Sequence, residues 1–262
     1  MRLPIYQIDA FSDRPFTGNP AAVVLLEAWL DDETQQAIAA ENNMTTTAFL
    51  IDDESNPKLR WFTPTIEEEI CGHATMATAW LVFNRLRPSL RQVTFDTRAG
   101  ALRVDRRDDG RLAIDFPTRP PKPVMPHPDL LAALGNPRPR EILAGRDYLV
   151  VLEDAAAVRA VRPDFRRLGA TDRHATIVTA PGDNGFDCVS RFFAPGHGID
   201  EDPATGAAHA SVAPYWAARL DKPVVRAFQA SKRGGTFECH LRGERVTFVG
   251  NCAFYMEGAI EI

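Results

Sequence analysis

The chain repeats one phrase half its length apart. The first copy reads Trp-Phe-Thr-Pro at 61–64 and leads through an acidic run to Cys-Gly-His-Ala-Thr at 71–75. The second copy reads Phe-Phe-Ala-Pro at 192–195 and leads through a second acidic run to Thr-Gly-Ala-Ala-His at 205–209. The two prolines are 131 residues apart in a chain of 262. This duplication predicts two similar domains, each with a glycine-rich helix start.

The start of each repeated helix is the part of the duplication with chemical consequences. A helix N-terminus carries a partial positive charge and unpaired backbone N–H groups, so it attracts carboxylates. Two such starts directed into one cleft would hold the carboxylate of a small substrate beside the polar side chains of both motifs. The duplication therefore predicts a cleft that binds a small acid and supports proton transfer.

Composition disfavours several classes of protein. Hydrophobic residues make up 45% of the chain and charged residues 25%, which is typical of a soluble globular protein. The net charge of −5 gives no reason to expect a nucleic-acid partner. The four cysteines form no CxxC pair, so neither a zinc site nor a disulfide framework is expected. No motif calls for a metal or an organic cofactor.

Targeting and membrane-spanning segments are not expected either. The first residues lack the apolar core of a signal peptide. No apolar run approaches the roughly 20 residues that are needed to cross a bilayer. We therefore expect a reduced, cytoplasmic, soluble protein with no membrane partner.

Short alternating or β-branched segments dominate both halves of the chain and are typical of strands. Their regular spacing favours an antiparallel sheet or barrel over a parallel sheet. The expected strands are Ile5–Phe11, Ala21–Leu26, Thr46–Ile51, Leu59–Phe62, Gln92–Asp96, Ala101–Val104, Leu112–Phe116, Tyr148–Leu152, Ala175–Thr179, Asp187–Phe193, Val224–Gln229, Thr236–Leu241, Arg245–Val249 and Ala253–Ile260.

Three helices are expected between these strands. Asp31–Asn42 has the mixed composition of a surface helix, with an aspartate at its start as the N-cap. Cys71–Leu86 and Gly206–Leu220 are apolar around nearly the whole circumference, which predicts burial on all sides. Pro214 inside the last helix should kink it or remove one backbone hydrogen bond. The pattern predicts an α+β fold in which a mostly antiparallel sheet wraps a central helix in each half.

A proline-rich segment at 116–128 separates the halves. Proline at this density favours an extended, semi-rigid backbone, which suits a linker. We therefore expect an N-terminal domain at 1–117 and a C-terminal domain at 118–252, with a last strand at 253–262 that can return to the first domain.

Several ordered motifs carry a family resemblance. They are Asp-Ala-Phe and Phe-Thr-Gly-Asn-Pro-Ala-Ala-Val-Val within 9–24, the motifs at 61–64 and 71–75, Glu-Asp-Pro-Ala-Thr-Gly at 201–206, and Ser-Lys-Arg-Gly-Gly at 231–235. Together the chain resembles the PhzF-like proteins of phenazine biosynthesis over almost its whole length. The resemblance implies two pseudo-symmetric diaminopimelate-epimerase-like domains, each a mostly antiparallel β-barrel around a central helix. It also implies an active site between the domains, a homodimer, and a cofactor-free proton shift on a small cyclic amino acid.

The resemblance also implies site residues, and the chain departs from the family pattern at two of them. His73 of the first motif and Asp202 of the second match the expected catalytic residues. The position of the family's proton-carrying glutamate is Thr46, and the position of a serine after the second helix glycine is Ala207. A neutral hydroxyl is a very weak base. We therefore expect the chain not to be an efficient isomerase of the phenazine precursor.

A second catalytic hypothesis concerns Cys71. Related epimerases of this fold use one thiol at each helix start, and here the facing positions are Cys71 and Thr205. A helix N-terminus lowers a thiol pKa, so Cys71 is a candidate thiolate base. The acidic run Glu67–Glu69 is expected to be solvated, with replacement of the missing glutamate by one of these acids as the alternative.

The remaining candidates are expected to bind the substrate. Backbone N–H groups at exposed glycines can hold a carboxylate, although a glycine can also serve only a turn or tight packing. The expected substrate-binding residues are Gly72, Gly206, Gly234, Arg233, Asn19 and Ala207.

Two functions remain open from the sequence. The first is a cofactor-independent isomerase-type protein that transfers a proton on a small amino or hydroxy carboxylic acid through His73 and Asp202. The second is a catalytically silent member of the family that binds a small carboxylate or a protein partner.

Overall fold

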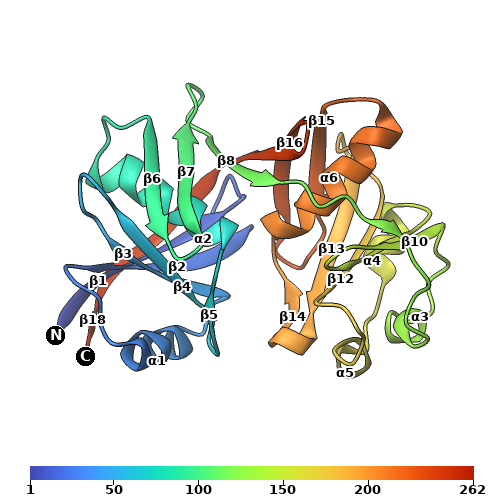
Figure 1. Cartoon of the computed structure of the whole chain (residues 1–262), viewed down its shortest axis with the longest axis horizontal. Coiled ribbons are helices and arrows are strands. Elements are labelled where there is room, and N and C mark those ends of the chain that lie inside the picture. Colours follow the sequence, from blue (N-terminus) through green and yellow to red (C-terminus); the bar gives the residue numbers. More distant parts are fainter. The chain divides into compact units, whose positions relative to one another are not determined.

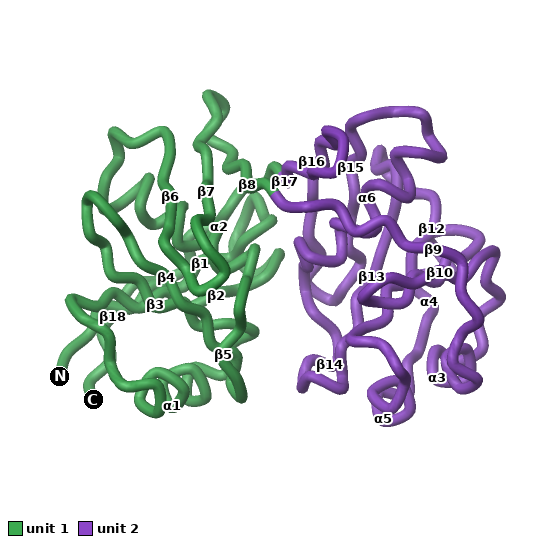
Figure 2. Tube along the Cα trace, in the orientation of Figure 1, with its two compact units in different colours: residues 1–115, 249–262 green, residues 116–248 purple.

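The computed structural model describes all 262 residues, and the chain divides into two compact units (Figure 2). Unit 1 comprises Met1–Asp115 and Val249–Ile262, and unit 2 comprises Phe116–Phe248. The fold is a mixed one of helices and strands, and most strand pairs are antiparallel. No helix is both long and apolar enough to span a bilayer.

Unit 1 is built on strands that the hydrophobic alternation predicts to within a few residues (Figure 1). The pairing order is β18–β1–β2–β3–β4–β6–β7–β8, with β5 on the other side of β4. Only the β2–β3 and β4–β6 pairs are parallel. The strands are β1 (Arg2–Ala10), β2 (Asn19–Leu26), β3 (Thr46–Ile51), β4 (Lys58–Phe62), β5 (Glu67–Glu68), β6 (Gln92–Thr97), β7 (Gly100–Arg106), β8 (Leu112–Pro117) and β18 (Cys252–Glu261).

Two helices belong to unit 1. Helix α1 (Asp32–Asn42) is capped by Asp31, whose carboxylate accepts a hydrogen bond from the backbone N–H of Thr34 at 2.8 Å. Helix α2 (Gly72–Leu81) is continued by one π-helical turn at Val82–Leu86. Most of α2 is buried, and the helix packs against β1, β2 and β3. Its continuous apolar composition therefore reflects burial among strands, as the sequence predicts.

Unit 2 repeats this plan. The pairing order is β9–β10–β11–β12–β13–β15–β16, with β14 on β13, and only β11–β12 and β13–β15 are parallel. The strands are β9 (Lys122–Pro123), β10 (Glu141–Ala144), β11 (Tyr148–Val151), β12 (Thr176–Pro181), β13 (Cys188–Ala194), β14 (Ile199–Asp202), β15 (Val224–Gln229), β16 (Gly235–Arg242) and β17 (Arg245–Gly250). The order of parallel and antiparallel pairs from β9 to β16 matches the order from β18 to β7 in unit 1.

Helix α6 (Gly206–Leu220) occupies the place in unit 2 that α2 occupies in unit 1, directly after the short strand β14. Pro214 lies inside α6 and cannot donate a hydrogen bond to the carbonyl of Ala210. That carbonyl instead accepts a hydrogen bond from the backbone N–H of Arg119 at 2.8 Å. The lost helical bond is thus replaced by the proline-rich segment at 116–128.

Several short elements have no counterpart in the sequence prediction. The short helices cover the sheet of unit 2, and two of them are capped by Asp154 and Asp164. The proline-rich segment is extended, as expected, and its residues Lys122–Pro123 also pair with β10. The helices that were not predicted are α3 (Leu130–Ala133), α4 (Ala155–Ala160) and α5 (Phe165–Leu168), and the strands are β5, β9, β10 and β14.

Candidate functional site

An arginine before each repeated helix start pairs with a glutamate on the next short strand. Arg60 on β4 donates to both carboxylate oxygens of Glu67 on β5, at 2.7 and 2.8 Å. Its guanidinium carbon also lies 5.0 Å from the ring centre of Phe62. The bidentate geometry fixes β5 against β4 directly before α2 begins.

The same arrangement recurs in unit 2. Arg191 on β13 donates to both oxygens of Glu201 on β14, at 2.7 and 3.0 Å, and its guanidinium carbon lies 4.8 Å from the ring centre of Phe193. Arg60 and Arg191 have the same 131-residue spacing as the repeated prolines. Sequence reasoning missed this pair, although the duplication already aligned the two arginines.

The expectation that the run Glu67–Glu69 is solvated was wrong for Glu67. Its side chain is half-buried and pairs with Arg60 and with Arg98. Both carboxylate oxygens are engaged, because an ion pair in a partly desolvated position favours direct contact over hydration. Glu67 therefore helps to hold β5 against β4.

A chain of three polar side chains lies at the start of α2. The hydroxyl of Thr46 is 3.5 Å from the sulfur of Cys71, and that sulfur is 3.4 Å from Nδ1 of His73. Strand β3 supplies Thr46, while Cys71 and His73 stand at the N-cap and the second position of the helix. The structure thus brings Thr46 into contact with Cys71, and Cys71 into contact with His73, three residues that the sequence named as candidates.

His73 is almost completely buried, with 8% of its surface exposed. Burial lowers the pKa of its imidazole from 6.5 to about 3, because the charged form is separated from water. The ring is therefore neutral at pH 7. Its Nε2 atom is buried and has no hydrogen-bond partner. An unsatisfied buried polar atom is costly, so one that persists is often functional.

The backbone at the start of α2 lacks the side-chain cap that surface helices of this protein have. Cys71 occupies the N-cap position, but its side chain makes no cap hydrogen bond. The hydroxyl of Thr75 donates to the carbonyl of Cys71 at 2.6 Å. The first-turn N–H groups of α2 therefore receive no acceptor from the N-cap side chain. This end of the helix is suited to an anionic group.

Asn19 lies beside this cluster. It is fully buried at the start of β2 and accepts a hydrogen bond from the hydroxyl of Thr45 at 2.8 Å, one residue before Thr46. The preceding Gly18 has φ of +68°, and a Cβ there would lie 2.2 Å from the carbonyl oxygen of Ala10. Only glycine fits this turn, which explains the Gly-Asn pair of the motif.

The start of α6 in unit 2 is organised by Asp202, Thr205 and Gln229. The hydroxyl of Thr205 donates to the carboxylate of Asp202 rather than capping the helix. Gln229 is fully buried; its amide oxygen accepts from the backbone N–H of Thr205 at 2.9 Å, and its amide nitrogen donates to the carbonyl of Asp202 at 2.6 Å. Asp202 is itself 5% exposed. A buried glutamine on β15 therefore fixes both ends of the turn that carries Asp202.

The glycine signature after β15 contacts the same turn. Ser231 donates its hydroxyl to the carbonyl of Pro203 at 2.7 Å and accepts from the backbone N–H of Gly234 at 3.0 Å. Gly234 has φ of +71°, which favours glycine. Its backbone N–H is thus used within the loop, and Arg233 beside it is partly buried.

The two residues that open α6 differ in accessibility. Gly206 is buried, whereas Ala207 is exposed. Sequence reasoning named both but missed Gln229, because nothing in a lone glutamine in a strand indicates which turn it will bond.

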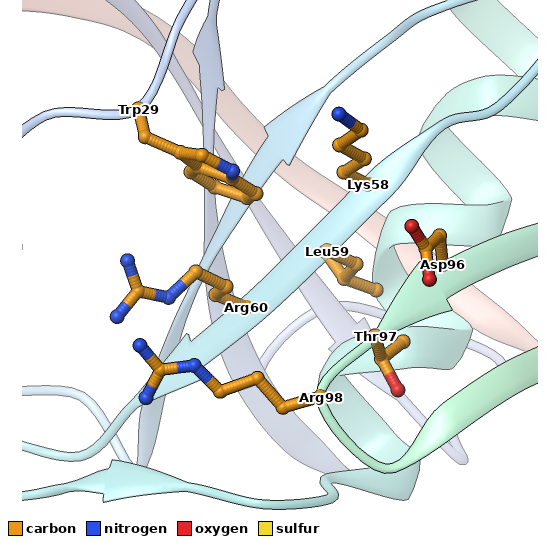
Figure 3. Close-up of a pocket in the computed structure, with 7 residues that line it drawn as sticks. All are labelled: Trp29, Lys58, Leu59, Arg60, Asp96, Thr97 and Arg98. Atoms are coloured by element: carbon orange, nitrogen blue, oxygen red, sulfur yellow. The ribbon is translucent and has the colours of Figure 1, made fainter.

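A hollow on unit 1 contains none of the predicted site residues (Figure 3). It is lined by side chains of both charges around an exposed tryptophan, and Arg60 at its base is already paired with Asp32 and Glu67. No group of three or more His, Cys, Asp or Glu side chains is arranged to hold a metal ion. The lining residues are Trp29, Lys58, Leu59, Arg60, Asp96, Thr97 and Arg98.

Comparison with known proteins gives consistent matches along the whole chain. The profile described as phenazine biosynthesis-like protein matches residues 8–258. An uncharacterized isomerase of Pseudomonas aeruginosa is 48% identical over 100% of both chains. A PhzF-family phenazine biosynthesis protein of Enterococcus faecalis superposes with a TM-score of 0.95 at 40% identity over 100% of both chains.

A more distant structure is similar in fold alone. A hydroxyproline epimerase of Agrobacterium vitis, solved with bound trans-4-hydroxy-L-proline, has a TM-score of 0.59 at 11% identity and covers 99% of this chain and 92% of its own.

Proposed function

The chain belongs to the phenazine biosynthesis-like family, and on that premise we propose that it transfers a proton on a small amino or hydroxy carboxylic acid without a cofactor. Family membership and an isomerase-named relative support an isomerase-type function. The proposed catalytic residues are His73 and Asp202.

One observation carries this proposal: the buried Nε2 of His73 has no partner. Because the ring is neutral at pH 7, one of its nitrogens can take a proton from a substrate carbon and return it to another position. The adjacent N–H groups at the start of α2 would meanwhile stabilise the substrate's carboxylate. No net oxidation or group transfer is involved.

Thr46 and Cys71 would support His73 rather than replace it. Each is within contact distance of the next in the order Thr46, Cys71, His73. If Nδ1–H donates to the sulfur and the thiol donates to the hydroxyl of Thr46, Nε2 of the neutral ring carries no proton and can accept one from the substrate. These two hydrogen bonds would then determine which ring nitrogen faces the substrate.

The proposed role of Asp202 is to hold the ammonium or hydroxyl group of the substrate. Gln229 and Thr205 fix its position, and a carboxylate held in this way suits binding more than proton donation. We also propose that the two units are the family's two domains, each a mostly antiparallel barrel around α2 or α6.

A catalytically silent binding protein is the second candidate function. Thr46 favours it, because its hydroxyl contacts Cys71 where the family has a glutamate, and Ala207 removes a further polar group. Such a protein would keep the carboxylate-binding helix start and lack turnover.

The test is exchange of carbon-bound hydrogen in D2O, followed by NMR. The panel contains dihydro-hydroxyanthranilate, diaminopimelate, proline derivatives and simple amino acids. Exchange that disappears in both His73→Ala and Asp202→Ala would support the isomerase. Line broadening of a carboxylate without any exchange would instead favour the binding protein.

The variant Thr46→Glu tests why activity on the phenazine precursor is expected to be low. It restores the family's proton carrier beside Cys71 and His73. A gain of turnover on that precursor would show that only the base is missing, and efficient turnover by the unaltered protein would contradict the expectation.

A further inference from the structure

The hollow on unit 1 has no part in the proposed function, yet it contains groups that can hold a ligand (Figure 3). Its volume is about 310 Å³, at the lower end of the range of small-molecule sites. Its walls come from the segment before α1, from β4, and from the end of β6 with the turn after it. None of the residues assigned to proton transfer lines it, so any ligand held here would occupy a separate site.

Arg60 at the base of the hollow has one terminal nitrogen that the chain does not use. Its Nε and Nη2 donate to Glu67, and Nη2 also donates to Asp32. Nη1 makes no hydrogen bond within the chain, and it keeps access to solvent although Arg60 as a whole is only 8% exposed. In Figure 3 one terminal nitrogen points to the side of Trp29 and the other to the side of Arg98. Because Arg98 shares both carboxylates with Nη2, the nitrogen on the side of Trp29 is Nη1.

The repeat provides an internal comparison for this nitrogen. In unit 2, Nη1 of Arg191 donates to the carbonyls of Val158 and Val161, at 3.3 and 2.8 Å. These two carbonyls lie at the C-terminal end of α4, so the chain itself supplies the acceptors there. Unit 1 supplies none to Arg60. The nitrogen that is satisfied internally in unit 2 is therefore open to an external acceptor in unit 1.

Two further side chains contribute to the hollow beside Arg60. Trp29 is 37% exposed, and its ring centre lies 5.5 Å from the guanidinium carbon of Arg60. An exposed indole face of this kind can stack on another planar ring. Lys58 lies two residues before Arg60 on β4, and therefore on the same face of the strand, and it adds an ammonium group. The hollow thus combines one aromatic face with two cationic hydrogen-bond donors.

The acidic residues around the hollow limit the charge of a ligand. Asp32 and Glu67 pair with the two arginines of the hollow, and Asp96 lines it as an exposed residue. Three carboxylates at this distance repel a multiply charged anion such as phosphate. A single carboxylate attached to a planar ring matches the available donors and the indole face better.

We propose that the hollow binds a small aromatic carboxylate. The ring stacks on Trp29, and the carboxylate accepts a hydrogen bond from Nη1 of Arg60 and is attracted by Lys58. A charge-assisted bond from a guanidinium group to a carboxylate is stronger than a neutral hydrogen bond, and the ring contact adds selectivity. This site goes beyond the proposed function and does not depend on it.

NMR of the tryptophan indole N–H groups tests the site, with sodium benzoate as the probe. The chain has four tryptophans, so four indole signals are expected, and Trp29→Leu identifies the signal of Trp29. We expect benzoate to shift the Trp29 signal saturably. If that signal stays in place at millimolar benzoate, or if only the signals of Trp61, Trp80 and Trp216 move, the proposal is wrong.

Three further probes separate the two parts of the ligand. Benzyl alcohol has the ring without the charge, acetate has the charge without the ring, and inorganic phosphate carries more charge. We expect each to shift the Trp29 signal with at least several-fold weaker affinity than benzoate. Acetate or phosphate that binds as tightly as benzoate would refute the contribution of the ring, and benzyl alcohol that does so would refute that of the carboxylate.

A pair of lysine variants tests the charge. Lys58 is partly exposed at the first position of β4, so Lys58→Gln removes the ammonium group with little effect on the fold. This variant should bind benzoate several-fold more weakly and benzyl alcohol as the unaltered chain does. Lys122→Gln is the matched control, since Lys122 is an exposed lysine of unit 2, and it should bind benzoate normally. Equal benzoate affinity in the two variants would overturn the proposed role of Lys58.

Discussion

The starts of α2 and α6 follow the same arginine–glutamate strand pairing but carry different polar side chains. Each follows a strand whose arginine, the buried Arg60 or the partly buried Arg191, donates to a glutamate on the next short strand. In unit 1 the helix start carries neutral groups, and one nitrogen of His73 has no partner. In unit 2 it carries a carboxylate, and Gln229 bonds the turn on both sides.

This difference separates polar groups that stabilise the fold from polar groups that destabilise it. A satisfied buried polar group contributes to stability, whereas an unsatisfied one costs free energy. The repeated arginines and Gln229 belong to the first kind, and His73 belongs to the second. Substitutions can test that division, because equivalent positions in the two units should respond unequally.

The largest effect is expected at the arginines. Arg191→Met should lower the free energy of unfolding by about 4 kcal/mol, because Glu201 loses its partner and the carbonyls of Val158 and Val161 lose a donor. Arg60→Met should cost less, about 2–3 kcal/mol, because Glu67 keeps Arg98. Urea denaturation measures both.

The control for the arginines is Arg103→Met, whose exposed pair with Asp105 should contribute little to the free energy of unfolding because water screens it. A larger decrease in the free energy of unfolding for Arg60→Met than for Arg191→Met would contradict the expectation that Arg98 compensates for the loss of Arg60.

The next effect contrasts Gln229 with His73. Gln229→Leu should cost about 3 kcal/mol, because a buried N–H at Thr205 and the carbonyl of Asp202 lose their partners. His73→Leu should leave stability within about 1 kcal/mol or raise it, since it removes an unsatisfied nitrogen. Thermal and urea unfolding of the two variants give the comparison, and a strongly destabilised His73→Leu would refute it.

A smaller effect is expected from pH. Burial lowers the pKa of His73 to about 3 and that of His209 to about 4, both from 6.5. Below pH 6.5 the unfolded chain binds protons that the folded chain does not, so stability is full above that pH and falls toward pH 4. Each histidine should contribute up to about 1.4 kcal/mol per pH unit.

The variants for this test follow from the repeat. His209 bonds the carbonyl of Thr205 at 2.8 Å as Thr75 bonds that of Cys71, so His209→Thr removes the titration and retains the bond. His73→Leu removes the other titration. Urea unfolding between pH 6.5 and 4 should give a shallower slope for each variant, and slopes equal to that of the unaltered chain would contradict the assignment.

The smallest effect concerns helix caps away from the site. Asp31→Ala and Asp154→Ala should each lower the melting temperature slightly, since each carboxylate accepts a hydrogen bond from the first turn of its helix. Thermal melts check this. No such cap exists at α2 or α6, so a negligible cost at both aspartates would remove the contrast between capped and uncapped helix starts.

By itself, the sequence determined the repeated plan, the limits of most strands and the burial of two helices, because these follow from local periodicity and from a duplication visible in the residues. It also indicated the positions of Thr46, Cys71 and His73 through motifs. Only the tertiary structure decided that these three contact one another and that Nε2 of His73 has no partner. The engagement of Glu67 by Arg60 and of Thr205 by Gln229 was likewise decided there. Such bonds join strands and loops far apart in the chain, so no local pattern records them, and burial decides which polar groups remain unpaired.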